Sequence, residues 1–116
     1  MRIDSDWTLG ARMEMSHATA GLLGAGEVLE LDPPRRLVHS MRALWSDDVR
    51  AEGTSRVTWD IAVIGADSCR LLVTHDELRE GAHEELYGGW PMILSGLKTW
   101  LETGEVLTTP GSLLYT

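Results

Sequence analysis

The chain has 116 residues, with 18 acidic and 10 basic side chains and a formal net charge of -8. This length suits a single domain over residues 1–116, and a hydrophobic content of 43% is enough for a buried core. The acidic balance disfavours nucleic-acid binding and docking on an anionic membrane, because both need a basic face. No apolar run is long enough to span a bilayer, and we expect no signal peptide at the start of this sequence.

The rarest residue types are also informative. Cys69 stands alone, so the chain has no internal disulfide, and a reducing cytoplasm is the expected compartment. The five tryptophans are spread along the chain from Trp7 to Trp100, and phenylalanine is absent. Large aromatic side chains scattered in this way are typical of one shared interior.

The first third of the chain predicts two strands. Residues 12–16 alternate, with Met13 and Met15 on one face, and residues 27–31 form an apolar strand. Three glycines between these strands are expected to form a turn: Gly21, Gly24 and Gly26. Residues 32–34, Asp-Pro-Pro, end the second strand, because proline has no N–H to donate to a ladder.

Three further strands are predicted over residues 36–44, 56–64 and 70–76, with polar connections over 46–53 and 65–68. Each strand alternates at period two. The positions on the predicted inner face are Leu37, His39, Met41, Val57, Trp59, Ile61, Val63, Leu71, Val73 and His75. Short polar connections between such strands predict an antiparallel meander with one face on the core.

The period changes near residue 90, which predicts a helix. Its apolar positions recur at steps of three and four: Trp90, Ile93, Leu94, Leu97, Trp100 and Leu101. Pro91 suits a first helical turn, and Gly104 suits a helix end. A shorter helical segment is expected over residues 82–87. Because the apolar stripe needs a partner, we expect the long helix to pack on the meander.

Several segments, taken together, resemble one protein family. They are Ser5-Asp6-Trp7 with Gly10, Gly26-Glu27-Val28-Leu29-Glu30, Asp32-Pro33-Pro34-Arg35-Arg36-Leu37, Thr74-His75, Gly89-Trp90-Pro91, Ile93-Leu94, Leu97-Lys98 and Leu101-Glu102-Thr103-Gly104. In this order and spacing, from about residue 5 to residue 105, the chain resembles the activator of heat-shock protein 90 ATPase homologue family. That family is part of the START-like, or SRPBCC, helix-grip superfamily.

The resemblance implies an α+β fold in which a curved antiparallel β-sheet grips a long C-terminal helix, with an apolar cavity between them. Members of the family usually begin with one more strand and two short helices, which this sequence lacks. The domain is therefore expected to be shortened at its N-terminus. The missing strand normally pairs with the last one, and an uncovered edge favours pairing with another chain. We accordingly expect a homodimer, a domain-swapped dimer or a poorly stable monomer.

The expected cavity lining combines the alternation with the resemblance. Its residues are Trp7, Met13, Met15, Leu37, His39, Met41, Trp59, Ile61, Val73, His75, Trp90, Leu94 and Leu97, with Trp45 as a further candidate. Aromatic and thioether side chains suit an apolar ligand of variable shape, and ordinary core packing is the alternative. His39 and His75 would bond to a ligand or act as a general base; alternatively, each is a hydrogen-bonded core histidine.

The other polar motifs do not match known catalytic, metal-binding or phosphate-binding patterns. No residue spacing suggests a nucleophilic triad, and His83-Glu84-Glu85 resembles a zinc-protease motif only superficially. The glycines at 21–26 are not followed by the Lys and Ser/Thr of a phosphate-binding loop. We expect Glu30 to point outward and the other acids, Glu84 and Glu85 included, to be solvated. The sequence therefore predicts no catalytic residue, metal or cofactor.

Three functions follow from these observations. The leading hypothesis is non-catalytic binding of a small hydrophobic molecule in the cavity. The alternative, which the family name implies, is a chaperone-interacting protein with a role in the stress response. The third is a cyclase or hydrolase of polyketide-like substrates that uses His39 or His75. A fold hosts many functions, so these alternatives stay open at this point.

Overall fold

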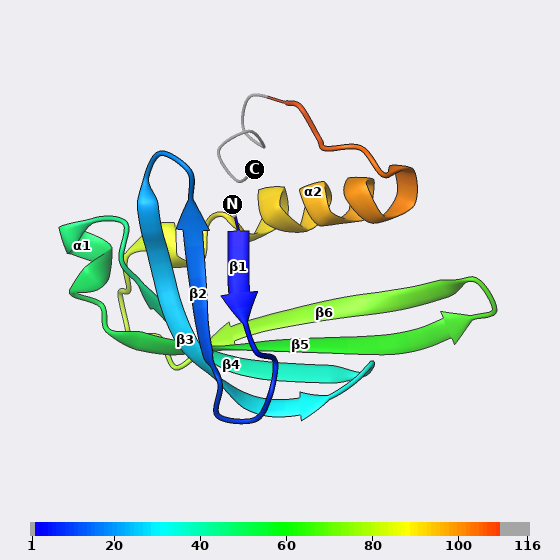
Figure 1. The fold of residues 1–116 in the computed structure, drawn as a ribbon, viewed down its shortest axis with the longest axis horizontal. Coiled ribbons are helices and arrows are strands. Elements are labelled where there is room, and N and C mark those ends of the chain that lie inside the picture. Colours follow the sequence, from blue (N-terminus) through cyan, green and yellow to red (C-terminus); the bar gives the residue numbers. More distant parts are fainter. Residues whose placement is uncertain (1, 110–116) are drawn as a thin grey trace.

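The computed structural model describes residues 2–109, which form one six-stranded sheet, two α-helices and a short 3-10 helix. The elements are β1 (Arg2–Ser5), β2 (Arg12–His17), β3 (Gly21–Asp32), β4 (Arg36–Ala43), α1 (Asp47–Arg50), β5 (Thr54–Gly65), β6 (Ser68–Asp76), η1 (Glu84–Leu86) and α2 (Trp90–Thr103). The sheet is curved and α2 lies to one side of it (Figure 1), which confirms the predicted α+β helix-grip fold.

Every neighbouring pair of strands is antiparallel, in the order β1-β2-β3-β4-β5-β6. The meander predicted for β4, β5 and β6 is therefore confirmed. Cross-strand register sets Leu37 opposite Trp59, and His39 opposite Val57. Partners directly opposite each other share a face of the sheet, so the predicted inner face is continuous across these strands. None of the described helices is long and apolar enough to cross a membrane.

The glycine-rich segment differs from the prediction. The expected turn is wrong, because β3 begins at Gly21 and carries Gly24 and Gly26 within the strand. The turn lies just before it, over residues 18–20. A Cβ at residue 26 would overlap the Ser40 carbonyl oxygen of β4. Here glycine allows close approach of two strands rather than reversal of the chain.

The connection between β4 and β5 is also more ordered than the expected polar loop. It contains α1, which is capped by Ser46: the hydroxyl oxygen accepts from the backbone N–H of Val49 at 3.4 Å. Asp47 and Asp48 in the first turn suit the positive end of the helix dipole. Val49 is completely buried, in a cluster with Ala43 and Leu86. This short helix therefore closes one end of the sheet.

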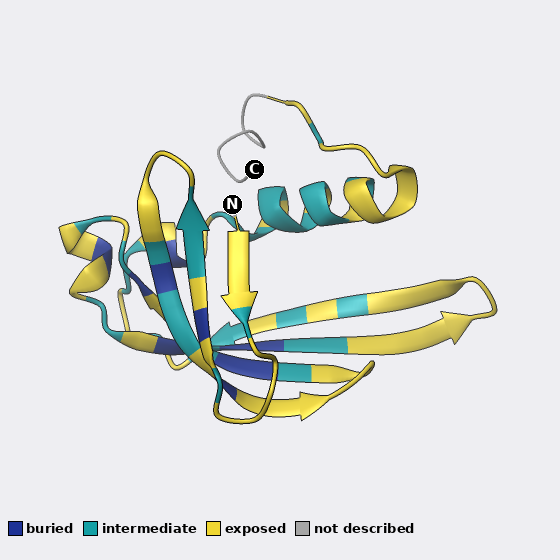
Figure 2. Ribbon diagram, viewed as in Figure 1, coloured by how far each residue is buried: buried dark blue, intermediate teal, exposed yellow. Residues whose placement is uncertain are grey.

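The C-terminal helix confirms its predicted limits. Pro91 lies in the first turn of α2, and Gly104 ends the helix with φ +74°, a left-handed conformation that glycine adopts readily. The shorter segment before it is reduced to η1, over Glu84–Leu86. No residue of α2 is buried, whereas buried residues lie along β2 to β5, in α1 and in η1 (Figure 2).

Candidate ligand-binding cavity

A cavity of about 760 Å³ lies between the inner face of the sheet and the segment that runs from η1 into α2. Its volume falls in the range of small-molecule sites. The sheet and its loops contribute Ile3, Trp7, Met13, Met15, Leu23, Leu37, His39, Met41, Trp45 and Trp59. The segment from η1 to α2 contributes Glu84, Glu85, Leu86, Tyr87, Gly88, Gly89, Trp90 and Ile93. The wall is therefore mainly aromatic and aliphatic.

The structure brings most of the predicted lining residues together. Those in the wall are Trp7, Met13, Met15, Leu37, His39, Met41, Trp59 and Trp90, together with the further candidate Trp45. The remaining predicted residues, Ile61, Val73, His75, Leu94 and Leu97, lie outside this wall. Ile61 lies past Asp60, where the pairing of β5 with β4 ends, and Leu94 and Leu97 lie past Ile93 on α2. Val73 and His75 lie opposite Trp59 and Val57 in β6, one strand further from the residues of the wall.

Part of the wall was missed by the sequence analysis. Leu23 was hidden by the expected glycine turn, although it lies in β3. Glu84 and Glu85 are exposed, as predicted, but they also border the cavity, because the segment around η1 lies beside it. Tyr87 borders the cavity as well and was not among the predicted lining residues. The available signal was Gly88-Gly89, which lets the chain turn closely from η1 into α2.

Hydrogen bonds occupy the indole N–H groups of three wall tryptophans. Trp59 donates to His39 Nε2 at 2.9 Å, and Trp90 donates to His75 Nδ1 at 3.1 Å. Trp45 donates to a carboxylate oxygen of Glu85 at 3.1 Å. The rings of Trp59 and Trp90 meet edge to face with centroids 5.6 Å apart. These contacts fix the orientation of the aromatic wall.

The partners of each histidine assign its tautomer. His39 Nδ1–H donates to the Ser40 carbonyl oxygen at 2.9 Å, so Nε2 is the acceptor for Trp59. His75 has the opposite tautomer: Nδ1 accepts from Trp90, and Nε2–H donates to Ser55 Oγ at 2.7 Å. Burial lowers the pKa of both histidines, and this effect outweighs the Ser40 carbonyl at His39. Both imidazoles are therefore neutral near neutral pH.

This network bears on the two interpretations of the histidines. A general base needs an unengaged lone pair within reach of the substrate. The Nε2 lone pair of His39 is taken by Trp59, and the Nδ1 lone pair of His75 is taken by Trp90. The geometry therefore favours hydrogen-bonded core histidines that orient tryptophans.

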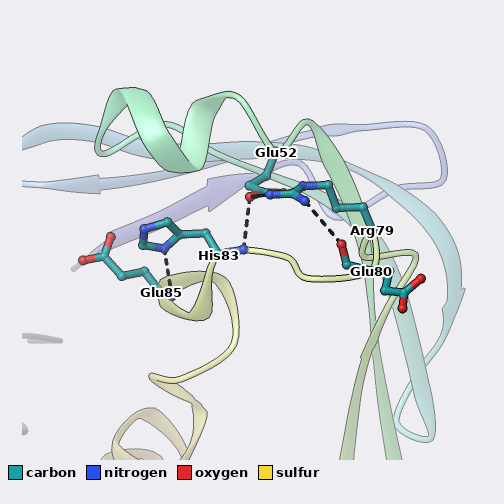
Figure 3. Close-up of polar contacts among 5 residues, drawn as sticks. All are labelled: Glu52, Arg79, Glu80, His83 and Glu85. Carbon is teal, nitrogen blue, oxygen red and sulfur yellow. Dashed lines mark hydrogen bonds and ion pairs between the residues drawn. The ribbon is translucent and has the colours of Figure 1, made fainter.

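A buried carboxylate secures the segment that leads into η1 (Figure 3). The Glu52 side chain, only 6% exposed, accepts from Arg79 Nη2 at 2.7 Å and from the backbone N–H of His83 at 3.0 Å. These two donors, the Arg79 hydrogen bond above all, hold the pKa of Glu52 below its ordinary value. His83 Nδ1 in turn accepts from the backbone N–H of Glu85 at 3.2 Å. The clamp thus fixes one wall of the cavity.

The outer face of the sheet is polar. Glu30 points outward as predicted and pairs with Arg36 at 2.7 Å, and Arg36 also contacts Asp60 at 2.8 Å. Arg56 and Asp76 form a second pair at 2.8 Å. Within residues 2–109, no three His, Cys, Asp or Glu side chains are grouped so that they could hold a metal ion. The outer face is therefore mainly polar and charged, with Val38 and Leu72 as apolar members.

Comparisons with known proteins agree with this architecture. The family model described as "Activator of Hsp90 ATPase homolog 1-like protein" matches residues 2–102. Among solved structures, the crystal structure of CalU16 from Micromonospora echinospora is similar, with a TM-score of 0.67 and 22% sequence identity. The similarity covers 90% of this chain and 59% of that one, so this chain spans little more than half the length of CalU16. No curated protein matches. The family match, over nearly the whole chain, shows that the protein belongs to the activator of heat-shock protein 90 ATPase homologue 1-like family.

Proposed function

We propose that the protein binds a small hydrophobic molecule in the cavity without transforming it. The observation that carries this proposal is the cavity of about 760 Å³, walled by tryptophan and methionine side chains. Burial of apolar ligand surface supplies the driving force, and flexible thioethers adapt to its shape. The wall indoles of Trp45, Trp59 and Trp90 already have internal acceptors, so an apolar guest leaves none of these three donors unsatisfied.

A charge placed in the wall tests the proposal. Ile93 lines the cavity from α2, whereas Leu101 is 68% exposed at the far end of the same helix. We expect Ile93→Glu to weaken binding of the neutral fluorophore Nile red at least about tenfold, because the carboxylate must be desolvated by the ligand. The matched variant Leu101→Glu should change the dissociation constant less than about twofold.

Nile red emission, titrated with protein, gives the dissociation constant, and far-ultraviolet circular dichroism shows whether both variants fold. The proposal is wrong if the unmodified protein fails to bind Nile red and a panel of neutral lipophiles saturably. Equal losses in the two folded variants would place the binding outside this cavity and would also contradict it.

A chaperone-directed role is the second candidate. Its support is the family description, which names an activator of the Hsp90 ATPase, and its place would be in the stress response. The net charge of -8 would suit a basic partner surface. The ATPase rate of purified Hsp90, with and without this protein, distinguishes the two roles: acceleration would support the chaperone role, and an unchanged rate would contradict it.

Enzymatic use of His39 or His75 has less support, because the acceptor nitrogen of each imidazole is bonded to a tryptophan. A cyclase or hydrolase would have to break one of these bonds to free a base. If a turnover is detected and replacing both histidines abolishes it in a protein that still folds, the enzymatic alternative displaces simple binding.

A further inference from the structure

We propose that the ligand is a cationic amphiphile, a molecule with an apolar body and a protonated amine or quaternary ammonium group. This inference rests on the proposed function, and it concerns the charge that the cavity prefers. It comes from the sign of the charges in the wall and from their position beside aromatic rings.

The wall is negatively charged at the η1 side. Within the described part of the chain, its charged side chains are Glu84 and Glu85, and it includes no lysine or arginine. His39, which also lines the wall, is kept neutral because burial lowers its pKa. A ligand in the cavity therefore meets two carboxylates without a compensating base.

These two acids also lack basic partners within residues 2–109. Neither takes part in an ion pair, and the nearby Arg79 is engaged by Glu52. Glu85 accepts from the indole N–H of Trp45 at 3.1 Å, which holds its carboxylate at the cavity. A carboxylate bonded to a neutral donor keeps its full negative charge available to a cation.

Two aromatic side chains belong to the same side of the wall. Trp45 bonds to Glu85, and Tyr87 lies two residues after Glu85 in the chain. Both rings are partly exposed, and an ammonium group over the face of such a ring is attracted by the ring quadrupole. Carboxylates and aromatic faces thus favour the same charge, whereas a fatty-acid anion would be repelled by Glu84 and Glu85. The net charge of -8 of the whole protein also favours a cationic ligand over an anionic one.

Three probes with the same decyl chain test this inference: decyltrimethylammonium, decanol and decanoate. Each competes with Nile red below its micelle concentration, at low salt and neutral pH. We expect the cation to bind at least about tenfold more tightly than the anion, with decanol between them, and the difference to shrink as salt is added.

Matched variants locate the source of the preference. The double variant Glu84→Gln/Glu85→Gln should reduce the cation-to-anion ratio to less than about threefold while leaving decanol binding unchanged. The new amide at position 85 retains a carbonyl oxygen for Trp45, so the wall keeps its shape. The control Glu80→Gln removes one charge from an exposed side chain of the same loop, outside the wall, and should preserve the ratio.

The outcomes separate the inference from the proposed function. Equal binding of the three probes, or tighter binding of decanoate, overturns the cationic preference and leaves apolar binding intact. A loss of preference in Glu80→Gln as large as in the double variant would assign the preference to the overall field and overturn the inference. Failure of all three probes to displace bound Nile red would overturn the inference alone, whereas failure of Nile red and of the neutral panel to bind would overturn the proposed function.

Discussion

The two ends of the sheet differ in how far their apolar residues are buried. At the closed end, where β3, β4 and β5 meet α1 and η1, Val49 is 0% exposed. At the open end, formed by the tips of β5 and β6, Val63 is 84% exposed and Ile64 is 65% exposed (Figure 2). Valine is present at both ends, so composition does not explain the difference. What differs is the covering layer.

At the closed end, α1 and η1 lie over the sheet, and the Glu52 clamp joins them. Within residues 2–109, β5 beyond Ile61 pairs with β6 alone, and no residue of α2 is fully buried. Packing is therefore concentrated beside α1 and η1, and the cavity borders this same end, since Met41 and Leu86 belong both to the buried cluster or its surroundings and to the cavity wall. Substitutions at the two ends should therefore lower the free energy of unfolding by unequal amounts.

The largest expected effect is at the closed end. Val49→Ala should lower the free energy of unfolding by about 2–3 kcal/mol, because it removes buried methyl groups and leaves a cavity. The matched change at the open end, Val63→Ala, should stay within about 0.5 kcal/mol. Urea unfolding of both variants measures the difference, and similar losses at the two sites would remove the distinction between the ends.

A smaller, pH-dependent effect is expected where α2 meets β6. The pKa of His75 is lowered in the folded state, so as pH falls below about 6.5 the unfolded chain takes up a proton that the folded chain does not. The free energy of unfolding should therefore decrease over this range. His75→Asn should flatten part of the decrease, because the amide oxygen still accepts from Trp90 and does not titrate.

The pKa of His39 is lowered in the same way, so some of the decrease should remain in this variant. Melting temperatures across the acid range give the profile. The control is His17→Asn, at the end of β2 and outside the network. If that control flattens the profile as much as the His75 change, the network is not the origin of the pH dependence.

Substitutions at the β6 edge should have the smallest effect on the stability of the monomer. Their main effect should be on the association of two copies of the chain. Within residues 2–109, β6 pairs with β5 and has no second neighbour in the sheet. We propose that a second copy of the chain pairs there, antiparallel and centred on Val73. This register would set Arg70 of one copy opposite Asp76 of the other, on the same face. The homodimer expected from the sequence thus has a charge-complementary register available.

Arg70→Glu should shift sedimentation velocity toward the monomer without altering the melting temperature of that monomer. Arg42→Glu, an equal charge change at an exposed position of the interior strand β4, is the control and should leave the dimer intact. A protein that sediments as a compact monomer at all concentrations would rule out the β6 pairing.

Much of the fold was predictable because its signals are local. Alternation located β4, β5 and β6, and the steps of three and four located α2, since each pattern follows from backbone geometry. The glycines of β3 led to the wrong prediction of a turn, because glycine is common both in turns and where two strands approach closely. Only the position of the Ser40 carbonyl beside Gly26 decides between these roles.

The site was predictable in part for the same reason. Alternation placed His39 and Trp59 on one face, but their hydrogen bond depends on a diagonal contact between two strands, which no sequence spacing reports. Glu84 and Glu85 have an ordinary surface pattern, and only the fold of η1 over the sheet brings them to the cavity. Likewise, the hydrogen bond from the backbone N–H of His83 to the Glu52 carboxylate joins residues that are 31 positions apart in the sequence.

The bonded indoles also bear on how selective such a cavity can be. Because Trp45, Trp59 and Trp90 direct their N–H groups to protein acceptors, a guest meets ring faces rather than donors. Ring faces and methionine side chains impose little directional constraint, so a guest could rotate or slide with small cost. One added or missing methylene in an apolar pocket is worth only about 1–3 kcal/mol. We expect such a wall to accept apolar bodies of varied outline, so that charge rather than shape would set most of the selectivity between ligands of similar size.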